Sequence, residues 1–186
     1  SEVAPLVRRP VEIDLDGTYT ELGVRSFGRG TFHKPDLIGA ELSWQKPFLV
    51  QEGDLVFSNI KAWEGAFAVA GPDDHGRVGS HRYLTCVPVD GLATAEFIWF
   101  YLQTHEGISK VQAASPGSAD RNRTLGQSAL EAITVPTPTV ERQHWFNGIQ
   151  TKICEARAIR ASTAQEAEAL VPAMLHEIFN GHSKAA

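Results

Sequence analysis

The strongest hydrophobic pattern of the chain lies in residues 140–179. Apolar side chains recur there at steps of three and four residues, which is the spacing of a helix face that packs against another helix. The residues on this register are Phe146, Ile149, Ile153, Ala156, Ala167, Leu170 and Met174. Arg160 and Thr163 interrupt the register, and the alanines between residues 156 and 169 add helix propensity.

A helix over residues 140–171 would be about 48 Å long at roughly 1.5 Å per residue. A compact domain of this size has a radius of gyration of only about 14–15 Å. We therefore expect part of the apolar face to pair with a second helix. The alternative is a terminal helix that docks on its own domain.

Upstream of residue 136, short apolar runs bounded by Gly, Pro and Asp predict strands. The expected strands are residues 48–50, 54–57, 66–70, 83–89 and a last one over 130–135. Residues 94–105 are expected to form a helix, with Thr94 as its N-cap and one buried face. The pattern therefore predicts a mixed α+β (α/β) fold with a mixed, twisted sheet, followed by the long helix.

The sequence Pro136-Thr137-Pro138 marks the boundary between these two parts. Proline fixes φ and disfavours helix in the residue before it, so this tripeptide predicts an extended connector. Thr139 then stands where the N-cap of the long helix belongs. We expect a globular domain over residues 1–139 and the helix over residues 140–186.

Composition restricts the class of protein. The chain has 186 residues, of which 42% are apolar, so it can form a hydrophobic core. No run of about 18 apolar residues and no secretory pattern are present, and Cys86 and Cys154 suit a reducing compartment, so a cytoplasmic protein is expected. The net charge of -5 means that a nucleic-acid reader would need its basic residues gathered on one face.

Four polar segments between the expected elements, residues 25–34, 58–65, 79–82 and 114–123, hold basic and aromatic residues. Arg and Lys bind phosphates, Arg and Asn bind base edges, and Gly allows close approach of the backbone. The candidates for DNA contact are Arg25, Arg29, His33, Lys34, Ser58, Asn59, Lys61, Trp63, Ser80, His81, Arg82, Arg121 and Arg123. Taken singly, each segment is also explained as an ordinary solvated loop.

Motifs of enzymatic chemistry are missing from the sequence. There is no P-loop, no Gly-x-Ser-x-Gly elbow and no methyltransferase tetrapeptide. His81 and Cys86 could form a base and a nucleophile, but the apolar neighbours of Cys86 predict a core residue. Residues 73–76 predict a tight turn rather than a metal loop. We expect no catalytic residues, no cofactor and no metal.

Five stretches, in order along nearly the whole chain, match the patterns of one family. They are residues 19–34 (YTELGVRSFGRGTFHK), 53–70 (GDLVFSNIKAWEGAFAVA), the 97–105 helix, 130–143 (LEAITVPTPTVERQ) and the Ile-Phe-Asn-Gly of 178–181. On these stretches the chain resembles the specificity (S) subunit of type I restriction-modification systems. The resemblance implies a target recognition domain followed by a conserved long helix.

Two features depart from the family's pattern. Pro-Thr-Pro-Thr at residues 136–139 replaces Leu-Pro-Pro, and Arg142 stands where Glu usually precedes Gln143, but the connector and the helix start are kept. Pro172 removes a helix hydrogen bond to the carbonyl of Glu168, which predicts a kink or a break over residues 168–172.

A whole S subunit usually has two recognition domains and two long helices that pair antiparallel, whereas this chain has one of each. The resemblance therefore implies a half-length subunit or a fragment that reads one half of a bipartite site in double-stranded DNA and performs no catalysis. The implied partners are the methyltransferase (modification) subunit, the restriction subunit and, through the helix, a second copy or half-subunit.

Two other hypotheses stay open. One is an interaction or regulatory module of such a complex, or of a related defence complex, without DNA contact, which the acidic charge favours. The other is an enzyme with a pocket among the loops. If DNA is bound, we expect Lys61 to neutralise phosphate and at least one of Arg29, Arg82 and Arg123 to pair with guanine.

Overall fold

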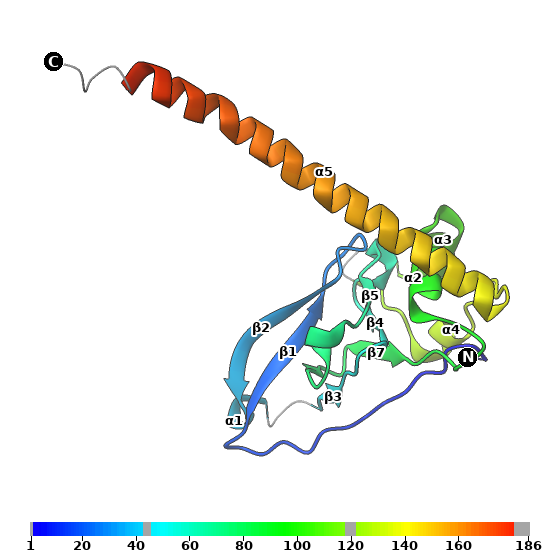
Figure 1. Cartoon of the computed structure of the whole chain (residues 1–186). Coiled ribbons are helices and arrows are strands. Elements are labelled where there is room, and N and C mark those ends of the chain that lie inside the picture. Colours follow the sequence, from blue (N-terminus) through cyan, green and yellow to red (C-terminus); the bar gives the residue numbers. More distant parts are fainter. Residues whose placement is uncertain (1, 43–45, 118–121, 181–186) are drawn as a thin grey trace. The chain divides into compact units, whose positions relative to one another are not determined.

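The computed structural model describes residues 2–42, 46–117 and 122–180 (Figure 1). The fold divides into two compact units, Ser1–His144 and Trp145–Ala186. The predicted fold class is confirmed, because mixed sheets and short helices are followed by a long C-terminal helix. The expected boundary at residue 139/140 stays a prediction.

One sheet of the first unit has four strands in the order β2-β1-β6-β3. β1 (Thr18–Val24) and β2 (Thr31–Ile38) form a twisted antiparallel hairpin (Figure 1), β6 (Val78–Gly79) runs parallel to β1, and β3 (Phe48–Leu49) pairs antiparallel with β6. Pro35 lies in β2, an edge strand, where its missing N–H costs no central ladder bond.

The other sheet has three antiparallel strands in the order β5-β4-β7. They are β5 (Phe67–Val69), β4 (Leu55–Ser58) and β7 (Tyr83–Cys86). Successive side chains of a strand point to opposite faces. Leu55 and Phe57 therefore enter one core cluster, while Val56 enters another. Both faces of β4 are buried, which explains its uninterrupted apolar sequence.

Helices cover the Leu55 and Phe57 side of this sheet. α2 (Ala95–Gln103) begins at Thr94, whose side chain accepts a hydrogen bond from the Phe97 N–H at 3.3 Å, so the expected N-cap is confirmed. α3 (His105–Ala113) and α4 (Gln127–Glu131) contribute Val111 and Leu130 to the same cluster. Short helical turns complete the unit: α1 (Gly39–Leu42), η1 (Ala62–Glu64) and η2 (Pro72–Asp74).

Three expectations about these elements are wrong. Residues 31–34 belong to β2, so only the first part of the 25–34 segment is a loop. The last strand over 130–135 is absent, because Leu130 lies in α4 and the residues after it take no strand partner among the described residues. α3 was not expected, although Thr104 caps it by accepting from the Gly107 N–H at 3.1 Å.

The long helix, α5 (Val140–Asn180), has 41 residues and contains Pro172 without a break. A kink or a break was expected near residues 168–172; the break is absent, and the kink stays a prediction. Proline removes one backbone hydrogen bond, while the bonds of the turns on either side continue the helix. In the described part of the chain, no helix has both the length and the apolarity needed to cross a bilayer.

Candidate nucleic-acid interface

Residues 58–65, here called the central loop, connect β4 to β5. Backbone hydrogen bonds close it tightly: the Lys61 N–H donates to the Ser58 carbonyl at 3.1 Å, and the Gly65 N–H donates to the Ala62 carbonyl at 2.8 Å. Gly65 has φ 80°, a left-handed conformation that glycine adopts without strain. The indole N–H of Trp63 donates to the Ile60 carbonyl at 3.2 Å, so the aromatic ring is held by the loop itself.

The β1–β2 turn joins the central loop. The Phe27 N–H donates to the Glu64 carbonyl at 2.9 Å, and the Gly28 N–H donates to the Gly65 carbonyl at 3.1 Å. The Ser26 hydroxyl also donates to the Glu64 carboxylate at 2.9 Å. The first basic segment of the sequence is therefore fixed against the second, although 38 positions of sequence separate Ser26 from Glu64.

The third and fourth segments also reach the central loop. The Asn59 N–H donates to the Arg82 carbonyl at 2.9 Å, and Leu125, two residues beyond the fourth segment, donates its N–H to the Asn59 carbonyl at 2.8 Å. The guanidinium of Arg123 lies 4.8 Å from the centroid of the Trp63 ring. All four segments singled out in the sequence thus converge on the central loop.

Both candidate lysines are paired with acids. Lys34 Nζ lies 3.0 Å from Glu21, which is buried, and Lys61 Nζ lies 2.8 Å from Glu64. The hydrogen bond from Lys61 is the largest cause that lowers the pKa of Glu64, so the carboxylate stays charged beside the ammonium. These contacts compensate the two lysine charges locally.

The histidine of β2 has a structural contact as well. His33 Nε2 lies 2.8 Å from an oxygen of Asp74, whose other oxygen accepts from the Thr31 hydroxyl and the Gly71 N–H, both at 2.9 Å. Asp74 is buried. This network ties β2 to η2 and accounts for His33 without any ligand.

Two of the candidate arginines bind main-chain carbonyls. Arg123 donates to the Ser115 carbonyl at 3.2 Å and to the Gln112 carbonyl at 3.1 Å, so it caps the C-terminal end of α3. Arg25 donates to the Thr31 carbonyl, and its guanidinium lies 4.8 Å from the centroid of the Phe32 ring. Arg121 lies outside the described residues.

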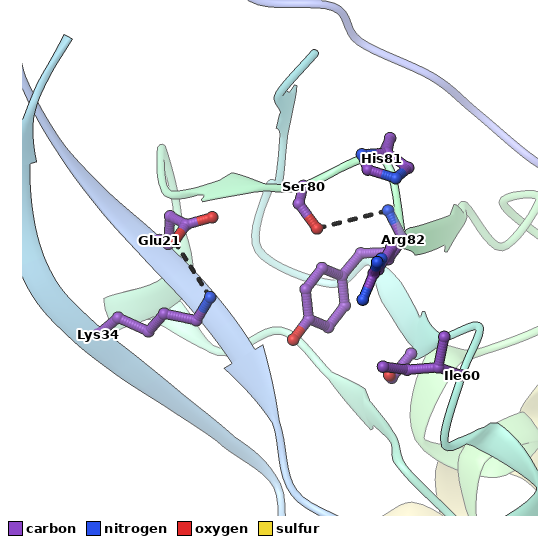
Figure 2. Close-up of a pocket in the computed structure, with 8 residues that line it drawn as sticks. Glu21, Lys34, Ile60, Ser80, His81 and Arg82 are labelled. Atoms are coloured by element: carbon purple, nitrogen blue, oxygen red, sulfur yellow. Dashed lines mark hydrogen bonds and ion pairs between the residues drawn. The ribbon is translucent and has the colours of Figure 1, made fainter. Parts of the chain in front are cut away.

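Of the remaining candidates, Arg29, His81 and Arg82 are exposed on turns, and Asn59 and Ser80 are half-buried. Ser58 is buried at the end of β4, so its expected place in a loop is wrong. Arg29 follows Gly28, and its guanidinium lies 5.8 Å from the centroid of the Phe27 ring. Ser80, His81 and Arg82 form the turn between β6 and β7. Together with Lys34 and Ser58 they line one pocket, which also includes Glu21, Ile60 and Tyr83 (Figure 2).

Arg8 is a residue of this region that the sequence did not indicate. Its guanidinium donates to the Tyr83 carbonyl at 2.7 Å and to the His81 carbonyl at 3.4 Å, and it lies 4.4 Å from the Phe48 ring centroid. Partial burial lowers the pKa of Arg8. No local signal pointed to this role, because its partners lie more than seventy positions away in the sequence.

The expected helix–helix register lies on α5. Phe146 and Ile149 are half-buried, whereas Ile153, Ala156, Ala167, Leu170 and Met174 are exposed. Near the C-terminal end, large apolar side chains at Leu170, Val171, Met174, Leu175 and Ile178 are also exposed at helical spacing. An apolar stripe of this kind is typical of a helix that pairs with another protein surface.

No protein-family model matches the chain, and no curated protein matches it in sequence. Solved structures share its fold. The HsdS subunit from Thermoanaerobacter tengcongensis superimposes with a TM-score of 0.64 at 20% identity, over 95% of this chain and 47% of that one. A chain from a structure of the type I R-M system gives 0.61 at 16% identity, over 100% of this chain and 52% of that one. The fold expected from the resemblance is therefore confirmed, and the chain spans about half the length of both neighbours.

Proposed function

We propose that this chain is a non-catalytic specificity subunit of a type I restriction-modification system, or one half of such a subunit. Residues 1–139 read one half of a bipartite site in double-stranded DNA. The region 140–186, which contains the long helix, docks the methyltransferase and restriction subunits. The ordered motifs of the sequence and the fold shared with an HsdS subunit support this proposal.

The observation that carries the DNA-reading role is the convergence of the four basic segments on the central loop. Backbone bonds join the loop to Phe27 and Gly28 of the first segment and to Arg82 of the third, and Arg123 of the fourth segment lies over the Trp63 ring, so these contacts exist before any ligand binds. A surface that is ordered in advance loses less conformational entropy on binding. Separate solvated turns do not require such connections.

The second half of the site needs a second recognition domain. The chain spans about half of each structural neighbour, so that domain comes from a second copy, from a second half-subunit, or from the rest of a two-domain subunit of which this chain is a fragment. The exposed apolar residues of α5 offer the pairing surface. Antiparallel pairing of two such helices would place two recognition domains at a fixed spacing, as a split DNA site requires.

Selection of bound sequences from random duplex DNA tests the proposal. We expect enrichment of one short sequence, and weaker binding of a scrambled duplex by fluorescence anisotropy. Lys61→Ala should weaken all duplexes alike, and less than an unpaired lysine would, because Glu64 already compensates its charge. Lys152→Ala, on the exposed part of α5, is the matched control. The absence of any enriched sequence would refute DNA reading.

A second function is favoured by one observation. Lys34 and Lys61 are both paired with acids, and acidic residues outnumber basic ones over the whole chain. These charges suit a module that binds a protein subunit without DNA contact. In that case the selection yields no enriched sequence, while the chain still co-elutes with a modification subunit in size-exclusion chromatography.

A further inference from the structure

The pocket beside the central loop is lined by three segments that are distant in sequence. Glu21 and Lys34 of the β1–β2 hairpin form one wall, and the turn from Ser80 to Arg82 forms the opposite one (Figure 2). Ser58, Ile60 and Tyr83 complete the lining of a cavity of about 360 Å³. Acidic, basic and uncharged polar side chains therefore line a space that the edge of a DNA base can enter.

In the wall with Glu21, the negative charge of Glu21 is paired with the positive charge of Lys34. The register of β1 with β2 shifts between Thr20 and Leu22, so Glu21 lies at an irregularity of this strand pair. Its carboxylate is buried and accepts a hydrogen bond from Lys34 Nζ at 3.0 Å. This acid is therefore already paired and is not needed to neutralise a basic group across the pocket.

The main chain of the opposite wall is fixed from several sides. The Arg82 carbonyl accepts from the Asn59 N–H at 2.9 Å, and the Tyr83 N–H donates to the Ser80 carbonyl at 3.0 Å. Arg8 donates to the carbonyls of Tyr83 and His81, the neighbours of Arg82 on either side. The turn is thus braced by the N-terminal segment and by the central loop.

The side chain of Arg82 contrasts with this fixed main chain. Arg82 is exposed, and over residues 2–42, 46–117 and 122–180 its guanidinium makes no hydrogen bond or ion pair. Arg25 and Arg123, in comparison, donate to main-chain carbonyls. Arg29 also lies on a turn that is fixed to the central loop, but its guanidinium lies 5.8 Å from the centroid of the Phe27 ring, and Arg29 does not line the pocket.

Building on the proposed function, we propose that Arg82 is a specificity-determining residue that pairs with a guanine in the major groove. The planar guanidinium donates two parallel hydrogen bonds to the O6 and N7 of guanine, a pattern that no other base offers. The braced turn supplies the rigid base that such geometry requires. Lys34 donates to Glu21 and thereby holds the Glu21 carboxylate in place, so Lys34 is a positioning residue.

The test compares Arg82→Lys and Arg82→Ala with the intact chain on the duplex that selection identifies. The intact chain should prefer guanine at one position by roughly 5- to 140-fold over the other bases. Arg82→Ala should lose that preference and leave the base preferences at all other positions unchanged. Arg82→Lys retains the charge but not the planar fork, so it should keep a weaker preference for guanine at that position. Arg157→Ala, which removes one exposed charge from α5, should change no base preference.

A modified base supplies a second readout. Replacing the guanine by 7-deazaguanine removes the N7 acceptor and should weaken binding of the intact chain, but not of Arg82→Ala. Inosine keeps O6 and N7 and should bind the intact chain as guanine does. If selection enriches a sequence and both Arg82 variants keep every base preference, this inference is wrong and the proposed function stands. If selection enriches nothing, the proposed function itself fails, and the inference fails with it.

Discussion

Gln143 offers a sharp test of how the first turn of α5 is held to the globular unit. Its side chain is fully buried and makes three hydrogen bonds to the main chain. Oε1 accepts from the Thr94 N–H at 3.0 Å, and Nε2 donates to the carbonyls of Leu92 at 3.0 Å and Pro138 at 2.8 Å. One amide thus connects the N-cap residue of α2 with the proline connector.

Gln143→Leu keeps the approximate volume and removes all three bonds. The buried Thr94 N–H then lacks this acceptor, which costs about 1–3 kcal/mol, while the carbonyls of Leu92 and Pro138 recover part of their bonding from water. The expected total is about 2–4 kcal/mol. Each kcal/mol lowers Tm by about 2–4 °C in a chain of this size, so a drop of roughly 5–15 °C is expected.

Thermal melts followed by circular dichroism measure this effect, with Gln165→Leu on the exposed part of α5 as the control. Gln143→Glu adds a pH dependence, because a buried carboxylate offers no N–H to the two carbonyls and its folded pKa is raised. Its deficit should be largest at neutral pH and should shrink as the pH falls towards about 4.3, the ordinary Glu pKa. If Gln143→Leu has the same Tm as the Gln165→Leu control, this reasoning is refuted.

Three further predictions concern other parts of the chain. Asp54→Asn should cost about 3 kcal/mol in urea denaturation, because Arg9 loses its bidentate partner at 2.7 and 3.1 Å; an unchanged midpoint would contradict it. A thiol reagent at pH 8 should modify exposed Cys154 and spare Cys86 until denaturant is added, since burial raises the Cys86 pKa to about 12. A chain of residues 1–144 should be a folded monomer by light scattering. A chain of residues 1–139 should be less stable, because it lacks the buried Gln143.

The elements that could be predicted from the sequence are those with a clean local pattern. The strands at 54–57, 66–70 and 83–89 were expected in nearly the right places, because both faces of β4 are buried and its neighbours are apolar. The helix after Thr94 was expected because its cap and its apolar face agree. β2 was not recognised, because Thr31–Ile38 is an edge strand in which no residue is fully buried and one is a proline.

The candidate site shows a different limit. Its loops were identified from composition, because Gly, Arg and Asn concentrate there. The sequence could not predict which of the basic residues already have a partner within the chain. The pairing of Lys34 with Glu21 depends on strand register, and the contact of Arg123 with the end of α3 depends on a helix that the sequence did not indicate.

The basic residues that already have a partner within the chain reduce the positive charge that is available for binding DNA phosphates. A lysine that is already paired with a carboxylate adds little to the neutralisation of phosphates, so it releases few counterions when DNA binds. Under the proposed function, the two paired lysines should contribute little to non-specific affinity, and the guanidinium of Arg82 should contribute to discrimination instead. We therefore expect DNA binding with a shallow salt dependence and a high ratio of specific to non-specific affinity. A net charge of -5 would then disfavour random DNA without preventing recognition of one half-site, because discrimination would come from base edges rather than from the total charge.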